Sequence, residues 1–264
     1  MNAAAETRQS ELDRALDASQ ATIEVAEELF AVTDLLETEP SLRRALTDPS
    51  APDAARRALA SSVLTGRVSD AAAAVATAAA GLRWGGPTGL VAALDRQGVR
   101  ALITVAQQAS MLDTVEEELF RFSRIVEANP ALRASLADRS TPLAARQELV
   151  ADLLRGRAHP ITISMATRAV AARQRTFDLT AQSFLGLAAQ ARRRAIATVT
   201  VAKPLPADQR ERLRAALVRQ LGREVNLHVV VDPDVLGGVR VSVGNEVIEG
   251  TVAGRLASAE RQLS

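Results

Sequence analysis

The side chains that most often act as nucleophiles, general bases or metal ligands are scarce in this chain. Its 264 residues include two histidines and no cysteine. His159 precedes a proline where a helix is expected to begin, and His228 lies in an alternating stretch typical of a strand. The two histidines therefore belong to different predicted domains. The chain has no HExxH motif and no carboxylate–histidine cluster with ligand spacing, so we expect no metal site.

Two acids and two glycines near the C-terminus are the other candidates for chemistry. Asp232 and Asp234 resemble a general acid–base pair, but Pro233 between them favours a turn, and we prefer the structural interpretation. Gly237 and Gly238 precede a strand rather than a helix, and the chain has no GxxxxGK[ST] sequence, so they do not form a P-loop. We expect no catalytic residue and no cofactor, and the protein is predicted not to be an enzyme.

The composition indicates how the chain builds its core. Aromatic residues make up 2% of the chain, whereas hydrophobic residues make up 47%, so the core must consist mainly of aliphatic side chains and alanine, as in closely packed helices. No apolar run reaches the roughly 20 residues that span a bilayer, and the N-terminus does not resemble a signal peptide. Together with the absence of cysteine, this predicts a soluble protein in a reducing, cytoplasmic compartment.

Charge is unevenly distributed along the chain. Residues 1–90 carry 8 basic and 13 acidic side chains, and the remainder carries 24 and 18. We favour ordinary solvated helix faces over a dedicated docking surface, although both interpretations stay open. The arginines between Arg192 and Arg223 could bind nucleic acid, but no aromatic residue that could stack on a base follows Phe184. A nucleic-acid-binding protein and a free-standing helical adaptor are therefore the alternative functions.

The first two thirds of the chain contain an internal repeat. Residues 27–67 align without a gap on residues 117–157, and 19 of the 41 aligned positions are identical, including Pro40 with Pro130. The shift of 90 residues is too long for a solenoid unit and is the size of a small domain. The sequence therefore predicts two similar helical bundles in tandem.

These patterns predict a mainly α fold with three domains: a first bundle over residues 1–90, a second bundle over 91–190 and a small α+β domain over 191–264. In the second bundle, apolar spacing and Gly156 predict a helix from Leu143 to Leu154. A longer helix from about Thr176 to Arg194 is expected to lead into the third domain.

The C-terminal domain is predicted to contain a strand, a helix, three short strands and a closing helix. A β-branched stretch from Ala195 precedes a helix whose leucines repeat every four residues. Apolar residues alternate from Val225 to Val231 and from Val239 to Val243, and Gly244-Asn245 favours a hairpin turn. From Thr251 the spacing becomes helical again.

This C-terminal segment carries a motif that spans turns, strands and the closing helix. In order, its residues are Asp232, Leu236, Gly237, Gly238, Gly244, Gly250, Gly254, Arg255 and Leu256. The pattern resembles the delta subunit of F-type ATP synthases, the family that includes the mitochondrial oligomycin-sensitivity-conferring protein. The resemblance covers the C-terminal third well and the middle third more loosely. Ser242 and Glu249 depart from the family's usual residues, but the turn glycines do not.

The resemblance implies a non-catalytic stator subunit of the peripheral stalk, which couples proton-driven rotation to ATP synthesis. In the family, a six-helix bundle holds N-terminal helices of the alpha subunits, and the C-terminal domain holds the end of the b subunit. The expected partners are therefore alpha and b subunits, without nucleic acid, in a single copy per complex. The protein is expected at the cytoplasmic face of the cell membrane, with membrane contact only through the complex. The family's bundle corresponds to the second copy, so the first copy is extra.

Seven residues are candidates for contact with an alpha-subunit helix. They line a predicted groove between two helices of the second bundle: Leu102, Val105, Ala106, Ala109, Ile161, Met165 and Ala169. Small side chains would let a partner helix approach closely. Alternatively, these residues fill the core of the bundle, and the sequence does not decide between the two.

Overall fold

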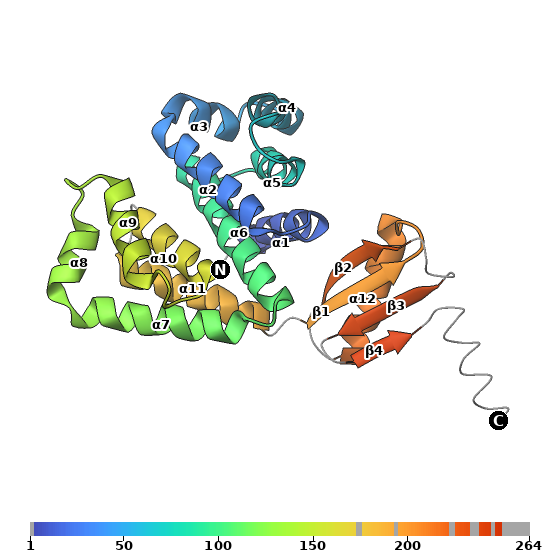
Figure 1. The fold of residues 1–264 in the computed structure, drawn as a ribbon. Helices are drawn as coiled ribbons and strands as arrows, with labels where there is room; N and C mark the ends of the chain where they lie inside the picture. Colours follow the sequence, from blue (N-terminus) through green and yellow to red (C-terminus); the bar gives the residue numbers. More distant parts are fainter. Residues whose placement is uncertain are drawn as a thin grey trace. The chain divides into compact units, whose positions relative to one another are not determined.

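The computed structural model describes residues 3–172, 176–192, 195–221, 225–232, 238–243 and 246–249. It divides into two compact units, Met1–Ala189 and Gln190–Ser264 (Figure 1). The described residues are mainly helical, with a small sheet in the C-terminal unit, which confirms the predicted fold class.

Four helices of the N-terminal unit recur 90 residues later. The first set is α2 Ile23–Thr38, α3 Pro40–Thr47, α4 Asp53–Leu64 and α5 Asp70–Gly81, and the second is α7 Leu112–Ala128, α8 Pro130–Ala137, α9 Leu143–Leu154 and α10 Pro160–Ala171. A shift of 90 residues converts the bounds of α3, α4 and α5 into those of α8, α9 and α10. The predicted helix from Leu143 to Leu154 is confirmed as α9.

One helix belongs to both copies. The remaining helices of the unit are α1 Ala3–Ala18, α6 Pro87–Gln108 and α11 Phe177–Arg192. Moving α1 forward by 90 residues gives 93–108, and moving α11 back by 90 gives 87–102, so α6 spans both ranges. The last helix of the first copy is therefore continuous with the first helix of the second. The predicted boundary after residue 90 lies inside α6, so the two copies overlap at this helix.

The ends of α6 follow from local sequence. Gly85-Gly86 interrupts the preceding helical pattern, and Pro87 stands at the first helical position, where its missing N–H costs nothing. At the other end, Ser110 has φ 56°, and the Met111 N–H donates to the Ala106 carbonyl at 2.8 Å. This left-handed residue closes the helix in the way that a glycine usually does.

The turn after the fourth helix of each copy uses a glycine at the same place. Gly66 follows α4 with φ 72°, and Gly156 follows α9 with φ 71°. Side chains with a Cβ rarely adopt this conformation. The paired glycines therefore preserve one turn in both copies.

The core of the N-terminal unit is aliphatic, as the low aromatic content predicted. Large side chains that are less than 2% exposed include Leu12, Leu16, Leu29, Leu36, Leu90, Leu94, Leu102, Ile103, Leu119, Ile161 and Met165. They come from α1, α2, α6, α7 and α10, so α6 contributes to the core on both sides of the copy boundary.

The C-terminal unit contains a four-stranded sheet in the order β2-β1-β3-β4. Its elements are β1 Ala195–Val201, α12 Ala207–Leu221, β2 Val225–Val231, β3 Val239–Val243 and β4 Glu246–Glu249. β1 and β2 are parallel, because α12 connects them as a crossover, while the β1–β3 and β3–β4 pairs are antiparallel. The predicted order of strand, helix and three strands is confirmed.

One face of this sheet packs against α12. Val199, Val201, Val225, Leu227 and Val241 are buried with Leu217 of the helix. The alternation seen in the sequence therefore places the valines toward the core. The predicted turn at Gly244-Asn245 and the closing helix from Thr251 lie outside the described residues.

Candidate partner-binding site

The structure places the seven predicted groove residues on two neighbouring helices, α6 and α10. Five are buried in the bundle: Leu102, Ala106, Ile161, Met165 and Ala169, each at most 1% exposed. Val105 is half-buried, and Ala109, the residue that caps α6, is exposed. The helices are brought together as predicted, and the side chains that a partner could reach are Val105 and Ala109.

The C-terminal motif is described at two positions. The Asp232 N–H donates to the Val201 carbonyl at 2.9 Å, which extends the pairing between β1 and β2. Gly238 has φ 87°, a conformation that favours glycine. Both observations concern the backbone, so at these two positions the motif has a structural role. Leu236, Gly237, Gly244, Gly250, Gly254, Arg255 and Leu256 lie outside the described residues.

An aromatic residue is exposed on α7. Phe120 is 55% exposed, whereas its counterpart in the first copy, Phe30, is 8% exposed. Phe30 packs against Gly98 of α6, where an added Cβ would lie 2.4 Å from Phe30 Cε1. The second copy has Ala188 at the corresponding position. A ring could not approach Ala188 as closely as the Phe30 ring approaches Gly98.

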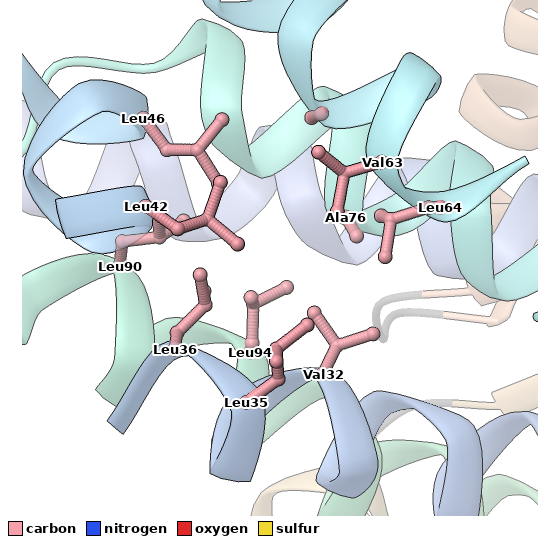
Figure 2. A pocket seen from close by; sticks show the side chains of 11 residues that line it. Val32, Leu35, Leu36, Leu42, Leu46, Val63, Leu64, Ala76, Leu90 and Leu94 are labelled. Atoms are coloured by element: carbon pink, nitrogen blue, oxygen red, sulfur yellow. The ribbon is translucent and has the colours of Figure 1, made fainter. Parts of the chain in front are cut away.

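The first copy contains an apolar pocket between α2, α3, α4, α5 and α6 (Figure 2). It measures about 310 Å³, counting the part that is open to solvent. The side chains that line it are all aliphatic: Val32, Leu35, Leu36, Leu42, Leu46, Ala60, Val63, Leu64, Ala76, Leu90 and Leu94. The pocket is therefore apolar and offers no side chain for acid–base or metal chemistry.

A glutamate caps the fifth helix of each copy. Glu28 of α2 accepts hydrogen bonds from the N–H and hydroxyl of Ser69, the residue before α5. Glu118 of α7 accepts from the N–H of His159, the residue before α10, at 2.8 Å. A carboxylate is favourable at a helix N-terminus, where the backbone N–H groups lack partners. The imidazole Nδ1 of His159 accepts from the Ile161 N–H at 3.2 Å, so this side chain also caps α10. The side chain of His228 lies outside the described residues.

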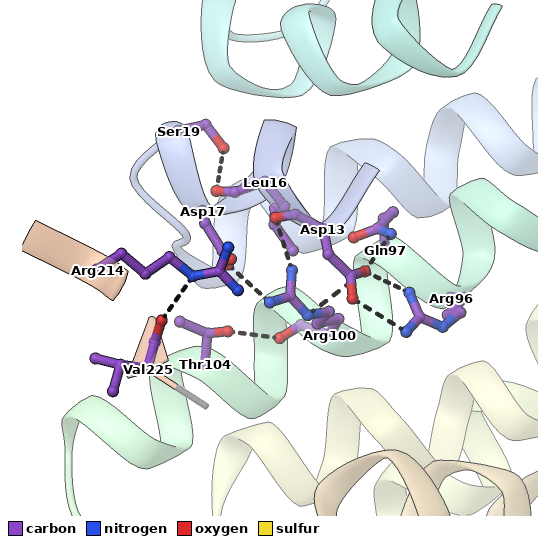
Figure 3. Close-up of polar contacts among 10 residues, drawn as sticks. All are labelled: Asp13, Leu16, Asp17, Ser19, Arg96, Gln97, Arg100, Thr104, Arg214 and Val225. Carbon is purple, nitrogen blue, oxygen red and sulfur yellow. Dashed lines mark hydrogen bonds and ion pairs between the residues drawn. The ribbon is translucent and has the colours of Figure 1, made fainter. Parts of the chain in front are cut away.

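Buried charges join α1 to α6 (Figure 3). Asp13 accepts from Arg96 at 2.6 Å and from Gln97 at 3.0 Å. Arg100 donates to the Asp13 carbonyl at 3.0 Å and to Asp17 at 2.8 Å. Burial alone would raise the pKa of Asp13, but the hydrogen bond from Arg96 and the charges of Arg100 and Arg96 together lower it to about 2. Asp13 is therefore ionised and fixed in place.

A second group of charges, centred on one buried arginine, joins three helices. Arg168 of α10 donates to Asp95 of α6 and, at 2.7 Å, to Asp34 of α2. Burial raises the pKa of Asp95, although Arg168 acts against this shift. Neither group of charges was predicted from the sequence. A signal was present, because the counterparts of Asp13 and Arg96 in the second copy are Ile103 and Gly186, so these charges depart from the repeat.

The arginines of α12 do not form an unbroken basic face. Arg212 pairs with Asp208 at 2.5 Å, and Arg214 lies 3.8 Å from Glu211. Acidic partners along the helix weaken the attraction for phosphate, so the nucleic-acid alternative gains no support.

The described part of the chain contains no group of three or more acidic or histidine side chains that could hold a metal ion. No helix there has the length and apolar character needed to cross a membrane.

A family model described as ATP synthase delta (OSCP) subunit matches residues 96–263. The match begins within α6 and runs through the second copy and the C-terminal unit. Residues 1–95, which hold most of the first copy, lie outside it.

Curated relatives match the chain more completely. It is 46% identical to the ATP synthase subunit delta of Parafrankia sp. (strain EAN1pec) over 91% of this chain and 86% of the relative. Identity to the subunit delta of Streptomyces avermitilis is 46%, over 92% of this chain and 89% of that protein. Because more than nine tenths of the chain is covered, both matches include most of residues 1–95.

A solved chain in a structure described as the Toxoplasma gondii mitochondrial ATP synthase hexamer is 20% identical. It covers 62% of this chain and 94% of its own length, with a TM-score of 0.29. This superposition is too loose to support a statement about the arrangement of the helices.

Proposed function

We propose, from the premise that the chain belongs to the ATP synthase delta (OSCP) subunit family, that it ties alpha subunits of the catalytic head to the b subunit. The chain is a peripheral-stalk subunit of the ATP synthase complex and has no active site of its own. The observation that carries the proposal is the family match from residue 96 to residue 263, which includes the second copy and the C-terminal unit.

The proposed function is mechanical. The stalk must resist the torque that rotation exerts on the catalytic head, so its contacts must neither slide nor dissociate during a turn. Interfaces of this kind need a sizeable apolar area and a rigid framework. A helical bundle with an aliphatic core supplies the framework, and a groove between two of its helices can hold a partner helix.

We place the alpha-subunit contact on the second copy, at the edge of the α6–α10 pair. Val105 and Ala109 are the accessible members of the predicted set, and the buried members keep the two helices apart at a fixed distance. The C-terminal unit, by the same proposal, holds the end of the b subunit. The protein then acts as a single copy at the cytoplasmic face of the membrane, without contact with lipid.

Co-purification tests the proposal as a whole. A tagged full-length chain expressed with alpha and b subunits should retain both through a high-salt wash, because apolar interfaces persist when charges are screened. Retention of neither subunit, with the chain folded, would contradict the proposal.

The alpha contact has its own test. Ala109→Trp should weaken binding of a peptide with the alpha subunit's N-terminal sequence by about tenfold, because a large side chain there blocks a close helix. Ala134→Trp, at an exposed position of α8, is the matched control. Equal affinity of both variants would rule out this position for the contact.

For the first copy we propose a supporting role against the stalk or the flank of the head. A chain that begins near Gly89 should form a less stable and less tightly coupled complex, measured as ATP hydrolysis that no longer depends on proton translocation. Full coupling of the truncated chain would argue against this role.

A further inference from the structure

The two copies meet at one buried guanidinium. Arg168 projects from α10 of the second copy and is 7% exposed. Its Nη1 donates to Asp34 of α2, in the first copy, at 2.7 Å, and its Nε donates to Asp95 of the shared helix α6. The guanidinium also lies 4.8 Å from the centre of the Phe30 ring. One side chain thus contacts both copies and the helix that they share.

The chemistry of this contact favours a fixed geometry. A guanidinium is planar and presents its donors in fixed directions, so it can bridge two carboxylates only when all three groups keep their places. The aromatic face beneath it adds an attraction that depends on stacking. Phe30 is itself fixed, because Gly98 leaves no space between its ring and α6. Rotation of α2 against α10 would break these contacts together.

The repeat shows that a bundle does not need this contact for its own folding. The position equivalent to Arg168 in the first copy is Ala78, and the positions equivalent to Asp34 and Asp95 in the second copy are Arg124 and Leu185. Neither copy therefore contains this triad within itself. The three charges occur only where the copies meet.

We propose that Arg168 is a positioning residue that holds the first copy at one orientation on the second, through Asp34, Asp95 and the face of Phe30. The clamp is a property of the isolated chain. Its use, which is to keep the first copy at a defined place against the stalk or the head, rests on the proposed function.

Distance measurements between two spin labels test the clamp directly. The chain has no cysteine, so Ala58→Cys in α4 and Ala134→Cys in α8 place one label on an exposed site of each copy. The otherwise unchanged full-length chain should give one narrow distance distribution. Arg168→Ala should broaden it by roughly twofold, because the copies then sample several orientations about α6, while circular dichroism shows that helix content is retained.

Three further variants sharpen the test. Arg155→Ala removes an exposed arginine of the second copy that pairs with Glu148 and Asp152 and with neither acid of the clamp, so it should leave the distribution narrow. Arg168→Lys keeps the charge but lacks the planar fork that directs separate donors at the two acids, so its distribution should be intermediate. The double variant Asp34→Asn with Arg168→Ala should broaden the distribution no more than Arg168→Ala alone. Both changes remove the same contact, the ion pair between these two side chains, so their effects should not add.

If Arg168→Ala fails to fold, Asp34→Asn decides, because Asp34 is 45% exposed and its change removes the ion pair between Arg168 and the first copy. A distribution as narrow as that of the parent chain in Asp34→Asn, or in a folded Arg168→Ala, would overturn the clamp. Neither result depends on alpha or b subunits, so the proposed function would be unaffected.

Discussion

Buried charge distinguishes the first copy from the second at the scale of single residues. Asp13, Arg96 and Arg100 form ion pairs between α1 and α6, whereas the second copy has aliphatic or uncharged residues at the equivalent positions. An ion pair that is removed from water needs good geometry to offset the cost of desolvation. Losing one partner therefore leaves a buried charge without compensation.

Asp13→Asn should lower the free energy of unfolding by about 2 kcal/mol at neutral pH, as the depressed pKa implies. Because the pKa of Asp13 is lower in the folded chain, this stability is present above about pH 4 and is lost as the pH falls toward 2. The difference between the variant and the parent chain should therefore shrink from pH 6 to pH 3. Urea unfolding followed by Trp84 fluorescence measures it, since Trp84 is the chain's single tryptophan.

Glu11→Gln, at an exposed position of α1, is the control and should change stability by less than about 0.5 kcal/mol. Parallel free energies for Asp13→Asn and the parent chain over the whole pH range would show that Asp13 does not carry this stability.

A pair of equivalent arginines permits a comparison within one chain. Arg56 is 3% exposed and donates to the carbonyls of Ala80 and Gly81 at the end of α5, both at 2.9 Å. Its counterpart Arg146 is half-buried and donates to the Leu136 carbonyl at 2.9 Å.

Arg56→Ala should cost about 3 kcal/mol of stability and Arg146→Ala about 1 kcal/mol, because the first leaves several buried carbonyls without donors. Chemical denaturation of the two variants, followed by circular dichroism, provides the comparison. Equal losses would mean that the extra bonds of Arg56 add nothing.

At the scale of elements, the close packing of α2 on α6 depends on a glycine. Gly98→Ala would normally favour a helix by about 0.5–1 kcal/mol, but its Cβ would meet the buried Phe30 ring. We expect a net loss of about 1–2 kcal/mol. Gly186→Ala on α11 meets no atom within 4 Å and should be stabilising. Thermal unfolding of both variants checks the opposite signs.

The Phe30→Leu background separates the two contributions, because a smaller side chain leaves space for the added methyl group. If Gly98→Ala is as costly there as in the parent chain, contact with the ring is not the cause.

Element positions were largely predictable from sequence, and the reason is local. Breakers such as Gly156 and the Gly85-Gly86-Pro87 segment fix helix ends through backbone conformation, which depends on few neighbours. The sharing of α6 was not predicted, because residues 1–90 and 91–190 were treated as separate bundles. Its continuity depends on packing against both copies, which periodicity within a short window does not reveal.

The candidate site was predicted less well than the fold. Apolar spacing identified α6 and α10 as neighbours, but the same spacing describes a core and a docking groove, and five of the seven residues proved to be buried. The ion pairs of Arg168 with Asp34 and Asp95 were not predicted, because these residues are far apart in sequence and follow no motif. Their meeting is a property of the tertiary structure.

At the scale of the whole molecule, the shared helix predicts cooperative unfolding of the two copies. Unfolding of the first copy would expose apolar side chains of α6 to water, and the second copy packs on the same helix. Unfolding followed by Trp84 fluorescence, which reports on the first copy, should therefore coincide with unfolding followed by a fluorescent label on Ala134→Cys, which reports on the second copy. Midpoints that differ by more than about 0.5 M urea would show that the copies unfold separately.

Sharing α6 also defines how such a chain can lengthen. Among the described residues, two copies of a six-helix unit use eleven helices, because one helix serves twice. Each further copy would add five helices and 90 residues, starting from the last helix of the copy before it. The rotation and shift that relate one copy to the next would then repeat, as in a screw. Each added copy would therefore lengthen the chain by the same distance and turn it by the same angle, and the shared helix would set both values.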